Sequence, residues 1–138
     1  MSILCINNVV STDNSSPSIV EWANNSELEI TIGKTYVVLA ISKYLDVLFY
    51  YILSDESEDY PLAYPSHLFE IIDSNISKFW MTSLTQIQFI NNLDIQNGEI
   101  ISFKEWAAKG DQFYENLLEG TNEEAKIFIT YRDMMLNE

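Results

Sequence analysis

Hydrophobic and polar positions alternate in the middle of the chain, and this period of two is typical of half-buried β-strands. Leu28, Ile30 and Ile32 alternate with polar residues up to a turn signal at Gly33. A β-branched and aromatic run follows over 36–41. The pattern therefore predicts one strand before this turn and a second, longer strand after it.

Further strands are expected on both sides of this region. The polar segment 11–18 contains a proline and is expected to be a loop after a short first strand. Stretches rich in β-forming residues then recur at 47–53, 61–64, 68–72 and 76–90. The last stretch is expected to add one or two strands, and its part 85–90 also fits a helix.

The pattern changes to helical spacing after Asn97-Gly98, which is a strong turn signal. In the stretch SFKEWAAKG, Ser102 is an N-cap candidate, Glu105 follows three residues later and Gly110 is a stop signal. This combination predicts a short helix over 102–110.

Two more helices are expected in the remaining sequence. Asp111 is a candidate cap for the first of them, and Gly120 is its stop signal. Thr121 and Glu124 have the spacing of a capping box at the start of the last helix. The apolar residues of that helix recur at helical spacing: Ala125, Phe128, Ile129, Met135 and Leu136.

The last helix also has a second apolar line on a different side, made by Ile127, Tyr131 and Met134. Either both sides pack into the domain, or one side contacts a partner or a second copy of the chain. The sequence leaves these two alternatives open.

The predicted strands fall within about residues 1–90 and the predicted helices within about 102–137. This segregation is typical of the α+β class. A chain of 138 residues suits one domain, and a hydrophobic fraction of 47% is sufficient for a core. We therefore predict a single α+β domain over 1–138, in which a small β-barrel or strongly bent antiparallel sheet precedes a helical segment.

The chain is strongly acidic, with 21 acidic residues, 7 basic residues and a formal net charge of −14. Nucleic acids and anionic membranes need cationic contacts, so neither is an expected partner. The charge instead favours a basic protein partner. Cys5 is the single cysteine, the start of the chain has no basic residue, and the longest apolar stretch is YVVLAI. These features predict a cytoplasmic protein without disulfides or membrane spans.

Few residues are available for catalysis or for metal binding. His67 is the single histidine and Cys5 the single cysteine, so a nucleophile with its base and orienting group is not expected. Zinc needs more Cys and His ligands than these two. With 4 glycines, no phosphate-binding or dinucleotide-binding fingerprint can be built. The sequence therefore predicts no enzyme activity, no cofactor and no metal.

The densest charge lies at LSDESEDYPL, and it raises the question of a calcium loop. Counted from Asp55, the sixth position of an EF-hand loop is Tyr60 instead of the required glycine. Two interpretations stay open for the four acids, which are a solvated turn or a contact patch for a basic partner. The acids are Asp55, Glu56, Glu58 and Asp59.

Carboxylates also recur along the predicted helical tail, and the chain has 8 tyrosines, 7 phenylalanines and 3 tryptophans. Aromatic side chains beside acids are suited to a partner rich in Lys and Arg. We therefore predict that the partner-binding residues are Asp55, Glu56, Glu58, Asp59, Tyr60, Tyr64, Asp111, Glu115 and Glu119.

The segment 28–73 resembles an SH3-like barrel. LEITIGKTYVVLAIS is similar to its first strand pair around a Gly-Lys turn, and YPSHLFEIID is similar to its closing segment. In that segment a Pro-Ser turn leads through one helical turn into the last strand. Leu68 falls near the position of the peptide-binding tyrosine of SH3 domains, so the resemblance does not imply binding of proline-rich peptides.

An SH3-like sheet followed by an acidic helical tail also resembles the small immunity proteins of bacterial polymorphic-toxin and contact-dependent inhibition systems. This resemblance implies a cytoplasmic, non-catalytic inhibitor that binds one cognate toxin domain, often a basic nuclease. The alternative is an SH3-like adaptor or a self-assembling regulatory module. Either a monomer or a weak homodimer is expected.

Overall fold

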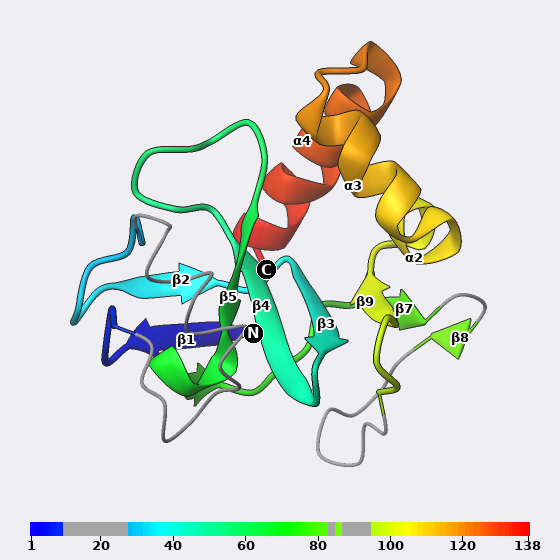
Figure 1. Cartoon of the computed structure of the whole chain (residues 1–138). Helices are drawn as coiled ribbons and strands as arrows, with labels where there is room; N and C mark the ends of the chain where they lie inside the picture. Colours follow the sequence, from blue (N-terminus) through cyan, green and yellow to red (C-terminus); the bar gives the residue numbers. More distant parts are fainter. Residues whose placement is uncertain (10–27, 83–84, 87–94) are drawn as a thin grey trace.

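The computed structural model describes residues 1–9, 28–82, 85–86 and 95–138 (Figure 1). Its described strands form two antiparallel sheets, and three helices follow at the C-terminal end. The α+β prediction is therefore confirmed. Neither sheet closes into a barrel within the described residues. The predicted loop 11–18 lies outside these residues.

The first sheet contains the N-terminal strand at its centre. Its strands have the order β2-β1-β6, and they are β1 (Ser2–Cys5), β2 (Thr35–Val37) and β6 (Phe69–Asp73). A 3₁₀-helix, η1 (Ser66–Leu68), leads into β6. The strand predicted over 68–72 and the helical turn before it are thus present.

The second sheet has the order β5-β4-β3-β9-β7-β8. Its strands are β3 (Ala40–Tyr44), β4 (Val47–Ile52), β5 (Leu62–Pro65), β7 (Met81–Thr82), β8 (Thr85–Gln86) and β9 (Ile100–Ser102). The strand expected over 47–53 is confirmed, and the short piece at 61–64 overlaps β5. Residues 85–86 are a strand, and 87–90 lie outside the described residues.

The strand expected over 28–32 is wrong. Its residues have no regular secondary structure, although the turn at Gly33 is present with φ 86°. The backbone N–H of Thr31 donates to the Tyr36 hydroxyl over 2.9 Å, and the Glu29 carbonyl accepts from the N–H of Asp55 over 2.9 Å. A bond to a nearby side chain and a bond to the distant residue Asp55 have replaced a strand ladder here.

The single strand expected over 36–41 is divided between the two sheets. Val38 and Leu39, each 1% exposed, lie between β2 and β3. The Val38 N–H donates to the Met1 carbonyl over 3.0 Å, and the Leu39 N–H donates to the Tyr51 carbonyl over 2.8 Å. An uninterrupted apolar run does not show where a chain leaves one sheet and enters another. The sequence pattern therefore did not predict the break between β2 and β3.

The helical tail consists of α2 (Lys104–Lys109), α3 (Asp111–Leu118) and α4 (Asn122–Leu136). Both glycine stops are confirmed, with Gly110 at φ 58° and Gly120 at φ 80°. The N–H of Gly120 donates to the Leu117 carbonyl and that of Thr121 to the Asn116 carbonyl, which is a Schellman motif.

The residues predicted as N-caps do not make the side-chain capping bonds that were expected of them. Ser102 lies in β9, a strand that the sequence did not predict, and its hydroxyl donates to the Leu39 carbonyl over 3.1 Å. Asp111 is the first residue of α3 instead of its cap. Thr121 is the N-cap of α4 but makes no side-chain capping bond. Glu124, at 3% exposure, instead accepts hydrogen bonds from two side chains, those of Lys109 and Asn116.

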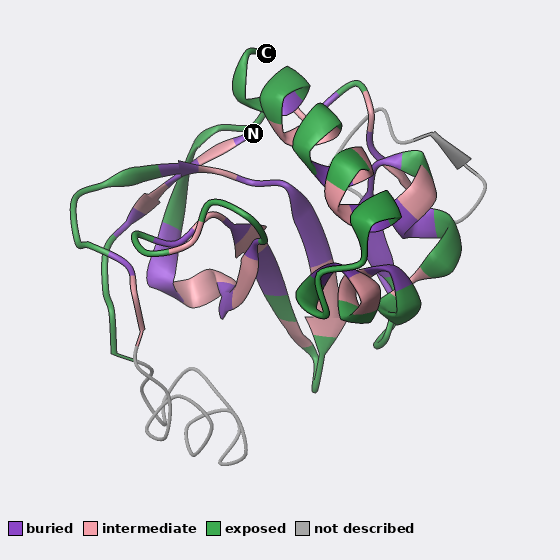
Figure 2. Ribbon diagram, turned by 90° about the horizontal axis from the view of Figure 1, so that it is seen from above, coloured by how far each residue is buried: buried purple, intermediate pink, exposed green. Residues whose placement is uncertain are grey.

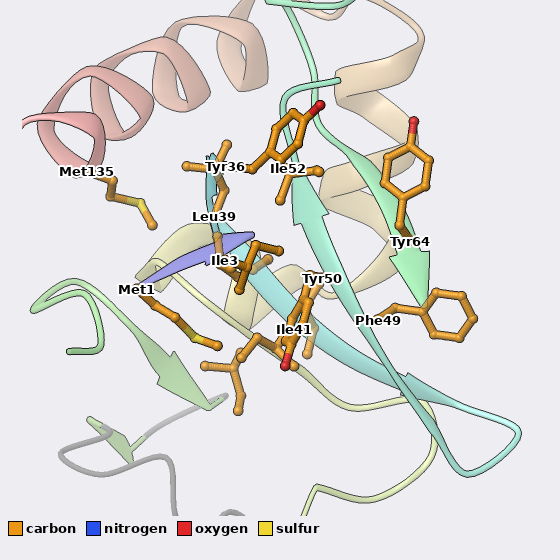
Figure 3. Close-up of a cluster of buried hydrophobic side chains, with 14 of the residues drawn as sticks. Met1, Ile3, Tyr36, Leu39, Ile41, Phe49, Tyr50, Ile52, Tyr64 and Met135 are labelled. Carbon is orange, nitrogen blue, oxygen red and sulfur yellow. The ribbon is translucent and has the colours of Figure 1, made fainter. Parts of the chain in front are cut away.

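Strand β4 lies between the first sheet and the helices. Successive strand residues point to opposite faces. Accordingly, Tyr50 packs against Phe69 of the first sheet, with ring centroids 6.0 Å apart, and Tyr51 packs against Trp106 of α2 at 5.0 Å. Figure 3 shows part of the resulting core, to which Met1 and the α4 residue Met135 also belong.

Aromatic rings join the helices to one another. Phe103 stacks on Tyr131 of α4 at 4.2 Å, and Trp106 stacks on Tyr114 of α3 at 5.5 Å. Ile127 and Tyr131 therefore pack against the core, whereas Met134 of the same predicted apolar line is exposed. None of the described helices is long and apolar enough to cross a lipid bilayer.

Replacement of Trp106 by alanine should lower the free energy of unfolding by about 3–5 kcal/mol, because a fully buried indole leaves a cavity between β4, α2 and α3. Chemical denaturation measures this difference. Ile129→Ala, on the exposed side of α4, is the control and should change stability by less than about 0.5 kcal/mol. A loss below about 1 kcal/mol for Trp106→Ala would show that the aromatic cluster does not hold the helices.

Candidate functional site

The acid-rich segment forms the loop 53–61 between β4 and β5, here called the acidic loop. Asp55, its first acid, is a structural residue. Its carboxylate accepts hydrogen bonds from Lys34 Nζ (2.5 Å), Thr31 Oγ1 (2.5 Å) and the Tyr36 hydroxyl (2.8 Å). Asp55 therefore attaches the loop to β2 and to the segment that precedes it.

These contacts set the ionisation of Asp55. Burial raises the pKa of its carboxyl, but the hydrogen bonds from Lys34, Thr31 and Tyr36 outweigh burial and hold the pKa below its ordinary value. The same contact raises the pKa of Lys34. The role of Asp55 as a partner-binding residue stays a prediction, and within this chain its carboxylate already has three donors.

The other acids of the loop point outward. Glu56, Glu58 and Asp59 are exposed, and the Ser57 hydroxyl donates to the Tyr60 carbonyl over 2.9 Å within the same turn. Tyr60 is 36% exposed. This part of the loop thus presents three carboxylates and one aromatic ring to solvent.

Helices α3 and α4 both touch the acidic loop. The hydroxyl of Tyr114 donates to the Pro61 carbonyl over 2.7 Å, and Arg132 Nη1 donates to the Glu58 carbonyl over 2.9 Å. Asp111 lies three positions before Tyr114 on α3 and is its neighbour on the helix surface, and Glu115 follows Asp111 by four positions; both acids are exposed. The loop and these helix carboxylates therefore lie on one side of the molecule.

We call this surface the acidic face. It consists of six exposed carboxylates that the sequence also singled out: Glu56, Glu58, Asp59, Asp111, Glu115 and Glu119. Within the described parts of the chain, the ion pairs are Lys34–Asp55, Lys109–Glu124 and Arg132–Asp133. None of them uses a carboxylate of the acidic face, and the cation that lies against this face, Arg132, is paired with Asp133.

Tyr64 does not belong to this surface, and its prediction as a contact residue is wrong. It lies in β5, pairs with Tyr50 and is 2% exposed. Burial raises the pKa of its hydroxyl to about 12. Apart from Tyr44 and Tyr60, the aromatic residues that the structure describes are buried or packed against the core. The surplus of aromatic residues is therefore mostly core.

Cys5 and His67 lie near each other in the fold. The N–H of Ile6, which follows Cys5, donates to the carbonyl of Leu68, which follows His67, over 2.9 Å. Cys5 is fully buried, and burial raises the pKa of its thiol, so the reactive thiolate is disfavoured at neutral pH. Burial lowers the pKa of His67.

Other chemistry has little support in the described structure. Among residues 1–9, 28–82, 85–86 and 95–138, three or more His, Cys, Asp or Glu side chains nowhere gather as a metal site would require. A hollow beside α2 is bordered by Thr82, Glu99, Ala107 and Lys109. Lys109 is already paired with Glu124, so the hollow holds no free acid–base pair.

Sequence reasoning missed the partners that separate Asp55 from the other acids. Thr31, Lys34 and Tyr36 lie between 19 and 24 positions away from it. No local pattern marks such contacts.

No protein-family model, curated protein or solved structure matches the chain. The SH3-like and immunity-protein resemblances therefore stay predictions.

Replacement of Asp55 by asparagine should lower the free energy of unfolding at pH 7 by roughly 1–2 kcal/mol, since charge-assisted bonds to a partly exposed carboxylate are lost. The folded-state pKa of Asp55 is depressed, so its contribution is complete above the unfolded-state value of about 3.9. The difference between wild type and variant should shrink as the pH falls below that value. Urea titrations across pH 2.5–7 measure it.

Glu56→Gln, one position along the same loop, is the matched control and should leave stability within about 0.5 kcal/mol of wild type. Equal effects of the two substitutions would contradict the structural role assigned to Asp55.

Proposed function

We propose that this protein is a non-enzymatic inhibitor of the immunity type, which binds and neutralises a cognate basic toxin domain of a bacterial cell. The observation that carries this proposal is the acidic face. Six exposed carboxylates lie on the acidic loop, on α3 and at its C-cap Glu119, and none of them is part of an ion pair within the described residues. A cationic protein surface supplies the missing counter-charge.

The net charge of −14 strengthens this interpretation. Like charges on a small folded protein repel one another, and a basic partner relieves that repulsion. Complementary charge also steers the two proteins together and can raise association rates to about 10⁸–10⁹ M⁻¹s⁻¹ at low salt. A fast association is useful for an inhibitor that must reach a toxin before the toxin reaches its substrate.

The acidic face is held by rigid elements, which suits a binding surface. Asp55 fixes one end of the acidic loop, and Tyr114 and Arg132 contact its other half. A surface that is already ordered loses little conformational entropy when it binds. In this proposal the protein acts in the cytoplasm and uses no cofactor, metal or nucleic acid.

A second candidate function is a self-assembling regulatory module. It is supported by apolar side chains of α4 that point to solvent, namely Ile129, Met134 and Leu136. Light scattering over a wide concentration range tests this candidate, because a mass that rises with concentration would favour it. A constant monomer mass would remove it and leave the inhibitor.

Charge reversal on the acidic face tests the inhibitor. The probe is the purified toxin domain encoded by the neighbouring reading frame, titrated calorimetrically with Glu56→Lys/Glu58→Lys/Asp59→Lys and with Asp111→Lys/Glu115→Lys/Glu119→Lys. Each triple variant should bind at least about tenfold more weakly, mainly through slower association, and the loss should shrink at high salt. Both variants should protect toxin-expressing cells less well than wild type.

The control carries the same change in net charge elsewhere, as Glu70→Lys/Asp73→Lys/Glu123→Lys, three exposed acids outside the acidic face. It should bind nearly as wild type does. If wild type neither binds the neighbouring domain nor protects cells that express it, the proposed function is wrong. If the control is weakened as much as the two test variants, the charge acts only as a general field.

A further inference from the structure

The turn signal Asn97-Gly98 is also a chemically labile pair, and it is the single Asn-Gly dipeptide of the sequence. Asparagine is one of the thermolabile residues. The backbone nitrogen of the following residue can attack its side-chain amide carbon, and glycine hinders this attack least because it has no Cβ. Asn97 and Gly98 are both exposed, so water reaches them.

The fold has a use for each member of this pair. Gly98 has φ 88°, and the N–H of Glu99 donates to the Gln96 carbonyl over 3.0 Å. A four-residue turn with positive φ at its third position is of type II, which favours glycine there. The side chain of Asn97 accepts from the Asp46 N–H over 3.0 Å and donates to Asp46 Oδ1 over 3.1 Å. Turn geometry and tertiary contacts therefore account for the two residues separately.

The turn that Asn97 contacts is strained. Leu45 and Asp46 form the whole connection between β3 and β4, and they have φ of 50° and 62°. Leucine is disfavoured at positive φ, because its Cβ approaches the backbone too closely. The N–H of Gly98 donates to the Lys43 carbonyl over 2.9 Å, so three hydrogen bonds from a distant segment hold this turn. Its tip has the exposed colour in Figure 2.

We propose that Asn97 is a deamidation site, and that its conversion to aspartate or isoaspartate releases the turn between β3 and β4. The pair Asn97-Gly98 supplies the reacting groups, and the contacts with Asp46 and Lys43 connect the reaction to the fold. This inference does not depend on the proposed function, because no partner protein takes part in the reaction.

Water is the co-reactant of this modification. The backbone nitrogen of Gly98 gives its proton to a water-derived base and forms a bond to Cγ of Asn97, and the side-chain nitrogen takes up a proton and leaves as ammonia. Water then opens the resulting succinimide ring, and the ring nitrogen regains its proton. Cleavage of the bond from nitrogen to Cγ gives aspartate, and cleavage of the bond from nitrogen to the backbone carbonyl carbon gives isoaspartate. No oxidant or reductant is needed.

The folded chain slows this reaction through the contacts of the pair. The N–H of Gly98 is held by the Lys43 carbonyl, and the oxygen and nitrogen of the Asn97 side chain are both held by Asp46. The attack requires these bonds to open. Deamidation therefore proceeds through local opening of the turn, and it is faster in the unfolded chain.

Either product removes contacts that hold the turn. Aspartate lacks the side-chain N–H that donates to Asp46 Oδ1, and it places a second carboxylate beside that of Asp46, where like charges repel. Isoaspartate adds a carbon atom to the backbone before Gly98 and displaces its N–H from the Lys43 carbonyl. Leu45 is then free to leave its strained conformation.

The first experiment measures the reaction itself. The full chain is incubated at about pH 8, folded in buffer and unfolded in about 6 M urea, and proteolytic peptides are analysed for an increase of about 1 Da at Asn97. The folded chain should convert over days, and the unfolded chain should convert at least about tenfold faster. No conversion of the folded chain, or equal rates in the two conditions, would overturn the proposal.

The second experiment measures the effect on the turn. Asn97→Asp, which has the same sequence as the aspartate product, should melt roughly 2–6 °C below wild type. Asn8→Asp is the control, because it adds the same charge at an exposed position outside this turn, and it should melt as wild type does. An Asn97→Asp variant with the melting temperature of wild type would contradict the release of the turn.

The exchanged pair Asp46→Asn/Asn97→Asp separates this contact from a general effect of substitution. It restores the bond between the two side chains with donor and acceptor reversed, and asparagine tolerates positive φ. It should melt as wild type does. It should also show no mass increase at this turn, because the exchanged asparagine precedes Val47, whose branched side chain hinders the attack. An exchanged pair that melts as low as Asn97→Asp would show that the contact with Asp46 does not hold the turn, against the proposal.

Discussion

Two neighbouring tyrosines of β4 connect the parts of this molecule. Tyr50 points into the first sheet and contacts Phe69, and Tyr51 points the other way and contacts Trp106. Because side chains alternate along a strand, one central strand can serve two cores at once. The helices, and with them the carboxylates of α3, take their position from the second of these contacts.

The acidic loop shows how one charged segment combines two tasks. Asp55 accepts three hydrogen bonds and fixes the loop, while Glu56, Glu58 and Asp59 stay exposed. A carboxylate with enough donors stabilises a fold, whereas exposed carboxylates without cations contribute little to stability and remain available for a partner. Variants intended to preserve the fold therefore have to leave Asp55 unchanged.

The proposed contact depends on charge that is held in place before a partner arrives. Long-range charge governs how fast proteins meet. The acidic loop is ordered by contacts within this chain, through Asp55 and through Tyr114 of α3.

Local patterns in the sequence were sufficient for the class of the fold, for several strands and for the helix ends at Gly110 and Gly120. They were also sufficient for the acidic character of the surface, since net charge depends on composition alone. These properties depend on backbone geometry within a few residues. The spacing of apolar residues and the positions of glycines indicate that geometry directly.

The tertiary structure decided the features that depend on distant partners. It divided the run 36–41 between two sheets. It placed Ser102 in a strand instead of at the cap of a helix, and it buried Tyr64. Asp55 and Glu56 are neighbouring acids of one loop, yet only Asp55 accepts hydrogen bonds from β2 and the segment before it. Such differences arise when the folded chain brings remote groups within hydrogen-bonding distance, and no local pattern encodes them.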